Sequence, residues 1–73
     1  MLQRLILEYF KEDKQTGDLY RQLQQRGFSK DEIARTFHAL RDLGYIIRTN
    51  PYGARLASFR TSETGKRLME INT

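Results

Sequence analysis

A glycine followed at once by a helix-capping sequence divides the first part of the chain into two short helices. Gly27 suits the left-handed backbone conformation that ends an α-helix. The next residues, Ser29-Lys30-Asp31-Glu32, have the S-x-x-E form of a capping box, in which Ser29 and Glu32 satisfy each other's backbone amides. Phe28 is expected to fill the corner between the two signals. We therefore predict two helices joined by a tight turn.

Apolar residues at helical spacing extend this pattern to further helices. Gly44 is expected to end a third helix as Gly27 ends the second. We predict helices over about residues 1–12, 18–26, 30–43 and 62–71, the last capped by Thr61 or Ser62. The predicted buried positions of the first three are Leu2, Leu5, Ile6, Tyr9, Phe10, Leu19, Tyr20, Leu23, Ile33, Phe37, Leu40 and Leu43.

A β-hairpin is predicted between the third and fourth helices. Residues 45–49 are β-branched or aromatic for the most part, and Asn50-Pro51-Tyr52-Gly53 fits a turn. The return strand is expected over about residues 54–61. Leu56 and Phe59 fall on opposite faces of a regular strand, so burying both requires a bulge.

Composition and charge exclude several classes of function. The chain has 73 residues, a formal net charge of +4, no cysteine and one histidine. It therefore has no disulfide or thiolate metal site, and we expect no cofactor and no enzyme activity. Its longest apolar run, residues 5–7, is too short to cross a membrane, so a soluble, cytoplasmic protein of one domain over residues 1–73 is expected. Between Gly44 and Ser62 the only charges are those of Arg48, Arg55 and Arg60, which suits a polyanionic partner.

Four stretches mark where the predicted elements meet. They are Thr16-Gly17-Asp18-Leu19 opening the second helix, Gly27-Phe28-Ser29 at the turn, Leu40 with Leu43-Gly44-Tyr45-Ile46 entering the hairpin, and Thr61 with Thr64-Gly65-Lys66-Arg67-Leu68 after it. With these stretches, the order helix, short strand at residues 15–16, helix, turn, helix, hairpin and helix resembles a winged helix-turn-helix domain, and more narrowly the core of PadR-like and MarR-like bacterial regulators. The resemblance implies an α+β, mainly α fold with a three-helix core, a two- or three-stranded β-wing and a C-terminal helix. Regulators of those families usually carry further helices for dimerisation and ligand binding, and none is predicted here, so we expect no small-molecule ligand.

In such a domain the third helix can enter a major groove of DNA while the wing reaches the neighbouring backbone. Arg35 is the best candidate for a base contact, because a guanidinium can bond guanine O6 and N7 together. Lys30, at the start of the helix, suits a phosphate. Not all the wing arginines can share one surface, because same-face positions on a strand are two residues apart. The predicted DNA-binding residues are Lys30, Ala34, Arg35, His38 and Arg41 of the third helix, with Arg48, Asn50, Tyr52, Arg55 and Arg60 of the wing.

Each of these side chains also has an ordinary interpretation as part of a solvated face, and Asp31, Glu32 and Asp42 on the same helix disfavour contact with phosphate. The function predicted from sequence is sequence-specific binding of double-stranded DNA by a small transcriptional regulator. The main alternative is a winged-helix module that binds another protein without binding DNA. RNA binding is a third interpretation, disfavoured because the aromatic residues are spaced for burial. If the protein forms a homodimer, its first and last helices are the expected surfaces.

Overall fold

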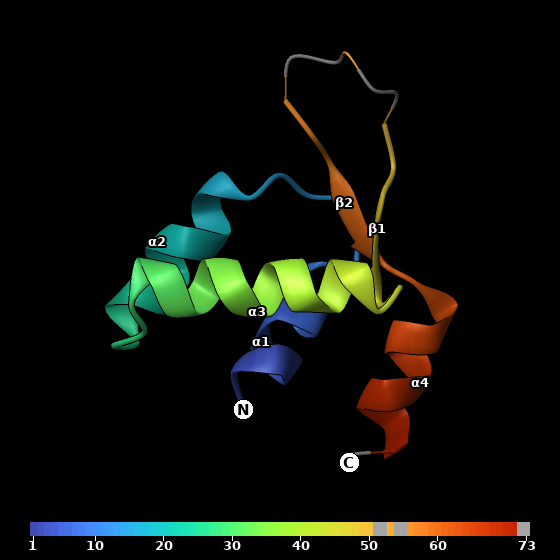
Figure 1. The fold of residues 1–73 in the computed structure, drawn as a ribbon, viewed down its shortest axis with the longest axis horizontal. Helices are drawn as coiled ribbons and strands as arrows, with labels where there is room; N and C mark the ends of the chain where they lie inside the picture. The colour runs from blue at the N-terminus through green and yellow to red at the C-terminus, as the bar shows by residue number, and fades with distance from the viewer. Residues whose placement is uncertain (51–52, 54–55, 72–73) are drawn as a thin grey trace.

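Helices surround an apolar core, and a β-hairpin projects from one side of it (Figure 1). This computed structural model describes residues 1–50, 53 and 56–71. Its elements, in chain order, are α1 (Leu2–Tyr9), α2 (Gly17–Gln25), α3 (Lys30–Asp42), β1 (Ile46–Arg48), β2 (Phe59–Thr61) and α4 (Glu63–Ile71). The α+β, mainly helical winged helix that the sequence predicts is thereby confirmed.

The glycines at the ends of α2 and α3 adopt the conformation that the sequence predicts. Gly27 and Gly44 have φ angles of 98° and 81°, in the left-handed region. At each helix end the glycine amide and the amide after it donate to carbonyls of the last turn, as in a Schellman motif. The two helices therefore end within a residue or so of their predicted limits.

The capping box at the start of α3 is also present. The Glu32 amide donates to Ser29 Oγ at 3.1 Å, and the Ser29 amide donates to Glu32 Oε1 at 3.3 Å. These two bonds fix the direction in which α3 leaves the turn, since they satisfy amides that have no partner within the helix.

The core lies between α1, α2, α3 and the inner face of the hairpin. Three rings form its centre: Phe10 is 5.5 Å from Phe37 and 6.1 Å from Phe59, and Phe37 is 5.1 Å from Phe59, measured between ring centroids. One ring comes from α1's end, one from α3 and one from the wing, so the core fixes the wing relative to α3. The buried apolar residues among those described are Ile6, Leu7, Phe10, Leu19, Leu23, Ile33, Phe37, Leu40, Ile46 and Phe59.

One buried residue is missing from the predicted core, and one predicted core residue is exposed. Leu7, which the helical pattern did not select, is buried because strand β2 and α4 cover that side of α1. Leu43, predicted to be buried, is 65% exposed, since α3 ends at Asp42 and no described element covers the side chain beyond it. Helix α1 is also shorter than predicted, ending at Tyr9 instead of about Glu12.

The hairpin is shorter than predicted and needs no bulge. Strands β1 and β2 pair antiparallel, with Ile46 opposite Thr61, Ile47 opposite Arg60 and Arg48 opposite Phe59. Leu56 lies outside β2 and is 59% exposed, so the difference in parity between Leu56 and Phe59 has no consequence. The inward positions of β2 are those of Phe59 and Thr61, both buried.

A third segment pairs with β2 on the edge away from β1. The predicted short strand at Gln15 and Thr16 falls one residue earlier and consists of a single bridge, in which Lys14 and Phe59 exchange backbone hydrogen bonds of 3.0 and 2.9 Å. The Lys14 ammonium lies 4.9 Å from the centroid of the Tyr9 ring. The wing is therefore two-stranded with one bridging residue.

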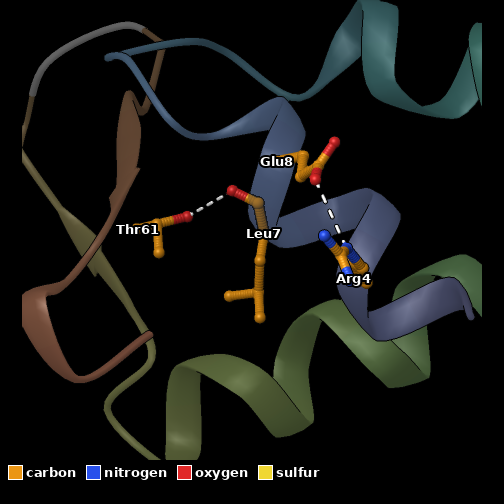
Figure 2. Close-up of polar contacts among 4 residues, drawn as sticks. All are labelled: Arg4, Leu7, Glu8 and Thr61. Atoms are coloured by element: carbon orange, nitrogen blue, oxygen red, sulfur yellow. Dashed lines mark hydrogen bonds and ion pairs between the residues drawn. The ribbon is translucent and has the colours of Figure 1, made fainter. Parts of the chain in front are cut away.

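Strand β2 is also fastened to the end of α1 by a buried threonine (Figure 2). The Thr61 hydroxyl donates to the Leu7 carbonyl at 2.6 Å, and the Thr61 amide donates to the Phe10 carbonyl at 2.7 Å. Both acceptors belong to the last turn of α1, where helix carbonyls lack partners within the helix. On the exposed side of the same helix, Arg4 and Glu8 form an ion pair at 3.4 Å (Figure 2). The base of the wing and α1 thus form one hydrogen-bonded unit.

Helix α4 packs closely on the turn that follows α3. Ser62 caps it, since its hydroxyl accepts from the Gly65 amide at 3.2 Å and donates to the Gly44 carbonyl at 2.6 Å. Gly65 is buried against the backbone of Tyr45. The glycine of the T-x-x-G stretch therefore permits close contact between α4 and the start of the wing.

Candidate nucleic-acid interface

The face of α3 that points away from the core carries most of the helix residues predicted to bind DNA. Lys30, Arg35 and His38 are exposed, and Ala34 is half-buried between them. Arg35 lies one turn before His38, and residues at such spacing share a helix face. Because the Ala34 side chain is small, another molecule can approach the backbone of α3 closely at that point. This face is accessible over the length of α3.

A groove separates the second half of α3 from the wing. It has a volume of about 370 Å³. Four of the residues predicted from sequence to bind DNA, His38, Arg41, Arg48 and Asn50, meet here although they come from two elements. Figure 1 shows why: the hairpin rises from the C-terminal end of α3 and stands beside it. The residues that line the groove are His38, Arg41, Asp42, Ile46, Ile47, Arg48 and Asn50.

Arg41 is held against the aromatic core. The carbon of its guanidinium lies 4.8 Å from the centroid of Phe59 and 6.0 Å from that of Phe37. Contacts of this kind stabilise a cation by about 0.5–2 kcal/mol, depending on its exposure. The half-buried Arg41 side chain is therefore a fixed part of the groove wall.

Asn50 is engaged within the wing by both ends of its amide. Its Oδ1 accepts from Arg48 Nε and from the Ser58 amide, each at 3.1 Å. Its Nδ2 donates to the Leu56 carbonyl at 2.6 Å. The side chain thus joins the two arms of the hairpin above the point where regular pairing ends. The sequence predicts Asn50 as a DNA contact. Its role in joining the two arms of the hairpin depends on bonds to residues six and eight positions away, which the local sequence pattern does not show.

The arginines of the wing are divided between two faces, as strand geometry requires. Arg48 is opposite Phe59 in the register and so shares the inward face with it, whereas Arg60 is opposite the exposed Ile47 on the other face. Arg60 is therefore not part of the groove. Tyr52 and Arg55, also predicted to bind DNA, lie outside the described residues.

Acidic residues moderate the positive charge of this surface to different extents. The Glu32 carboxylate is used by the capping box. Asp31 is exposed near the start of α3, and Asp42 is exposed at the rim of the groove. Asp42 lines the same groove as Arg48, a proximity that depends on where the hairpin stands and that the sequence of α3 does not show.

A second hollow, near the start of α2, is a weaker candidate for an anion site. Tyr9 donates to the Gln15 carbonyl there at 3.1 Å. Partial burial, together with the negative charge of Asp18, raises the pKa of Tyr9 above its usual value. Asp13 and Asp18 both line the hollow and would repel an anion.

The described part of the chain offers neither a metal site nor a membrane-spanning helix. Among the residues described, no group of three or more His, Asp or Glu side chains is placed to hold a metal ion. None of the helices in the described part of the chain combines the length and the apolar character needed to span a bilayer.

Comparisons with known proteins support the fold. No family model matches the sequence, and no curated protein matches it. Among solved structures, the chain is similar to a PadR family transcriptional regulator from Eggerthella lenta, with a TM-score of 0.75 and 19% sequence identity. The similarity covers 97% of this chain and 67% of that one. The fold is thus a PadR-like winged helix, in agreement with the resemblance drawn from the sequence.

Proposed function

We propose that this protein is a sequence-specific, double-stranded DNA-binding regulator of transcription that acts in the cytoplasm. The observation that carries the proposal is the groove in which cationic side chains of α3 and of the wing meet. His38 belongs both to that groove and to the exposed face of α3, so the two surfaces are continuous. The solved PadR family structure adds support at the level of the fold.

In this proposal α3 enters the major groove and the wing follows the neighbouring backbone. Arg35 reads a base, Ala34 permits close approach, and Lys30 meets a phosphate near the start of the helix. Arg60, on the outer face of the hairpin, remains a proposed contact, as do Tyr52 and Arg55, which lie outside the described residues. A gel shift on random duplex over a range of salt concentrations tests the proposal directly. We expect binding that weakens steeply with salt, and absence of binding at low salt would contradict it.

Replacement of Arg35 by alanine is expected to weaken binding to the preferred duplex by about 1–3 kcal/mol and to relax preference at one base pair, because a bidentate contact to guanine would be lost. Selection of duplexes from a random pool, followed by measurement of Kd on single-base variants, checks this.

Arg67→Ala is the matched control, since Arg67 is also exposed but lies on α4. It should leave base preference unchanged. An equal loss on every duplex for Arg35→Ala would argue for a phosphate contact instead of base reading.

A second proposal, a protein partner, is favoured by an apolar groove on another side of the molecule. This groove lies between α1, the end of α3 and α4 and has a volume of about 610 Å³. The exposed Leu43 lies at its edge. We propose a second copy of the chain as the partner, through the first and last helices. Its lining consists of Met1, Gln3, Arg4, Leu7, Leu40, Leu43, Tyr45, Leu68 and Met69.

Sedimentation over a range of protein concentrations tests the homodimer. Leu43→Lys places a charge in the apolar groove without disturbing a buried residue, and we expect it to shift the population to monomer. Leu56→Lys is the matched control, because Leu56 is exposed to a similar extent but lies on the wing. Identical dissociation for both variants, or a monomeric wild-type protein at every concentration, would contradict the dimer.

A further inference from the structure

We infer that the groove between α3 and the wing is a prearranged seat for a single phosphodiester of the DNA backbone. Arg41 and Arg48 bind the phosphate from opposite walls, while Phe59 and Asn50 are positioning residues that hold these two guanidinium groups. The inference rests on the proposed function and makes it more specific, since it assigns Arg41 and Arg48 to the backbone and leaves base reading to Arg35.

The position of Arg41 is the first argument. The carbon of its guanidinium lies over the Phe59 ring, 4.8 Å from the centroid, so this contact restricts where the guanidinium and its in-plane N–H donors can lie. Arg41 also lines the groove, and we infer that its donors serve a group bound there. A planar fork whose orientation is already fixed loses less side-chain entropy when it binds a phosphate.

The position of Arg48 is the second argument. The register places Arg48 on the same face of the hairpin as Phe59, which is the face that Arg41 contacts. The bond from Arg48 Nε to Asn50 Oδ1, at 3.1 Å, holds the Arg48 guanidinium against the wing. Asn50 is itself held by Ser58 and Leu56 of the other arm, so it orients Arg48 relative to the whole wing.

The composition of the groove favours a phosphate over a base. Its charged residues are Arg41, Arg48 and the exposed Asp42, so cationic side chains outnumber carboxylates in the lining, which favours an anion. Its lining also includes the buried Ile46, whose side chain offers no hydrogen bond to a base edge. A backbone that runs between a helix in the major groove and a wing beside it passes through this space.

Methylphosphonate scanning provides the test. In a duplex selected from a random pool, each phosphate near the site is replaced in turn by a neutral methylphosphonate, and Kd is measured for the full chain. We expect one position at which wild-type binding weakens about tenfold, since a charge-assisted hydrogen bond contributes about 1.5–3 kcal/mol and 1.4 kcal/mol is tenfold. In Arg41→Met, whose aliphatic stem keeps its packing on Phe59, the penalty at that position should fall below twofold while penalties elsewhere remain.

Asn50 is tested by coupling to Arg48. Asn50→Ala leaves the net charge unchanged, yet it should reduce the same single penalty, and it should add little to the effect of Arg48→Ala. Thr49→Ala, at the exposed neighbouring residue, is the matched control and should leave the penalty intact. Faster hydrogen exchange of the Ser58 amide in Asn50→Ala, measured without DNA, would verify that the brace itself is lost.

The outcomes separate the two proposals. Retention of the full penalty at every position by Arg41→Met, or additive effects of Asn50→Ala and Arg48→Ala, would overturn the phosphate seat while DNA binding stands. Failure of the wild-type chain to bind any duplex would overturn both.

Discussion

Replacement of Phe10 by alanine is expected to lower the free energy of unfolding by about 3–5 kcal/mol, the largest effect of any substitution considered for this chain. Phe10 is fully buried, and its ring contacts those of Phe37 and Phe59. A domain of 73 residues has a total stability of only about 4–11 kcal/mol, at roughly 0.05–0.15 kcal/mol per residue. The substitution should therefore remove a large part of the total stability. Urea denaturation followed by circular dichroism measures the loss.

Phe28→Ala is the matched control, because the same chemical change is made at a half-buried ring in the turn between α2 and α3. Folding removes less apolar surface of Phe28 from water than of Phe10, so we expect the free energy of unfolding to fall by no more than about 2 kcal/mol. Equal losses for the two variants would show that the three-ring cluster is not the centre of the core.

Replacement of Gly65 by alanine is expected to destabilise the fold by about 3 kcal/mol, at the upper end of the range for overpacking. An added Cβ would lie 2.5 Å from the Tyr45 carbonyl oxygen and 2.6 Å from Thr61 Cγ2. The first of these is backbone and the second belongs to a buried side chain, so α4 as a whole must move. Because Ser62 of the same turn bonds Gly44 and Tyr45, that movement would also strain the start of the wing.

Gly17→Ala is the control for this substitution. Gly17 also lies in the first turn of a nine-residue helix, but an added Cβ there meets nothing within 4 Å. We expect no loss, or a gain of about 0.4–1 kcal/mol from the reduced entropy of the unfolded chain. Thermal unfolding of both variants under the same conditions decides the matter, and similar melting temperatures would contradict the close approach of α4.

Local signals in the sequence predicted the helices well because their ends are determined locally. Gly27, Ser29 with Glu32, and Gly44 each act through backbone bonds to residues at most five positions away. The turn signal at residues 50–53 added the hairpin, and the resulting order of elements carried the resemblance to PadR-like regulators. These features together were sufficient for the fold.

Long-range contacts account for what the sequence did not predict. Leu7 is buried because Thr61, 54 residues later, packs on the last turn of α1, and no helical pattern contains that information. Likewise, the candidate site could be predicted as a set of cationic residues but not as a groove. Two features of the groove depend on strand register: the contact of Arg41 with Phe59, and the placement of Arg48 and Arg60 on opposite faces. The sequence did not predict the register, because Leu56 and Phe59 fall on opposite faces of a regular strand and either face could be the buried one.

The bridge at Lys14 bears on how this protein would behave when concentrated. At Phe59, strand β2 has partners on both sides, β1 on one and Lys14 on the other. Unsatisfied strand edges are the usual starting points for sheet growth between molecules. Strand β2 offers no such free edge at Phe59, because both of its sides are paired there. Strand β1, at the edge of the sheet, is three residues long and ends in an arginine. Strand-by-strand polymerisation therefore has little backbone from which to begin.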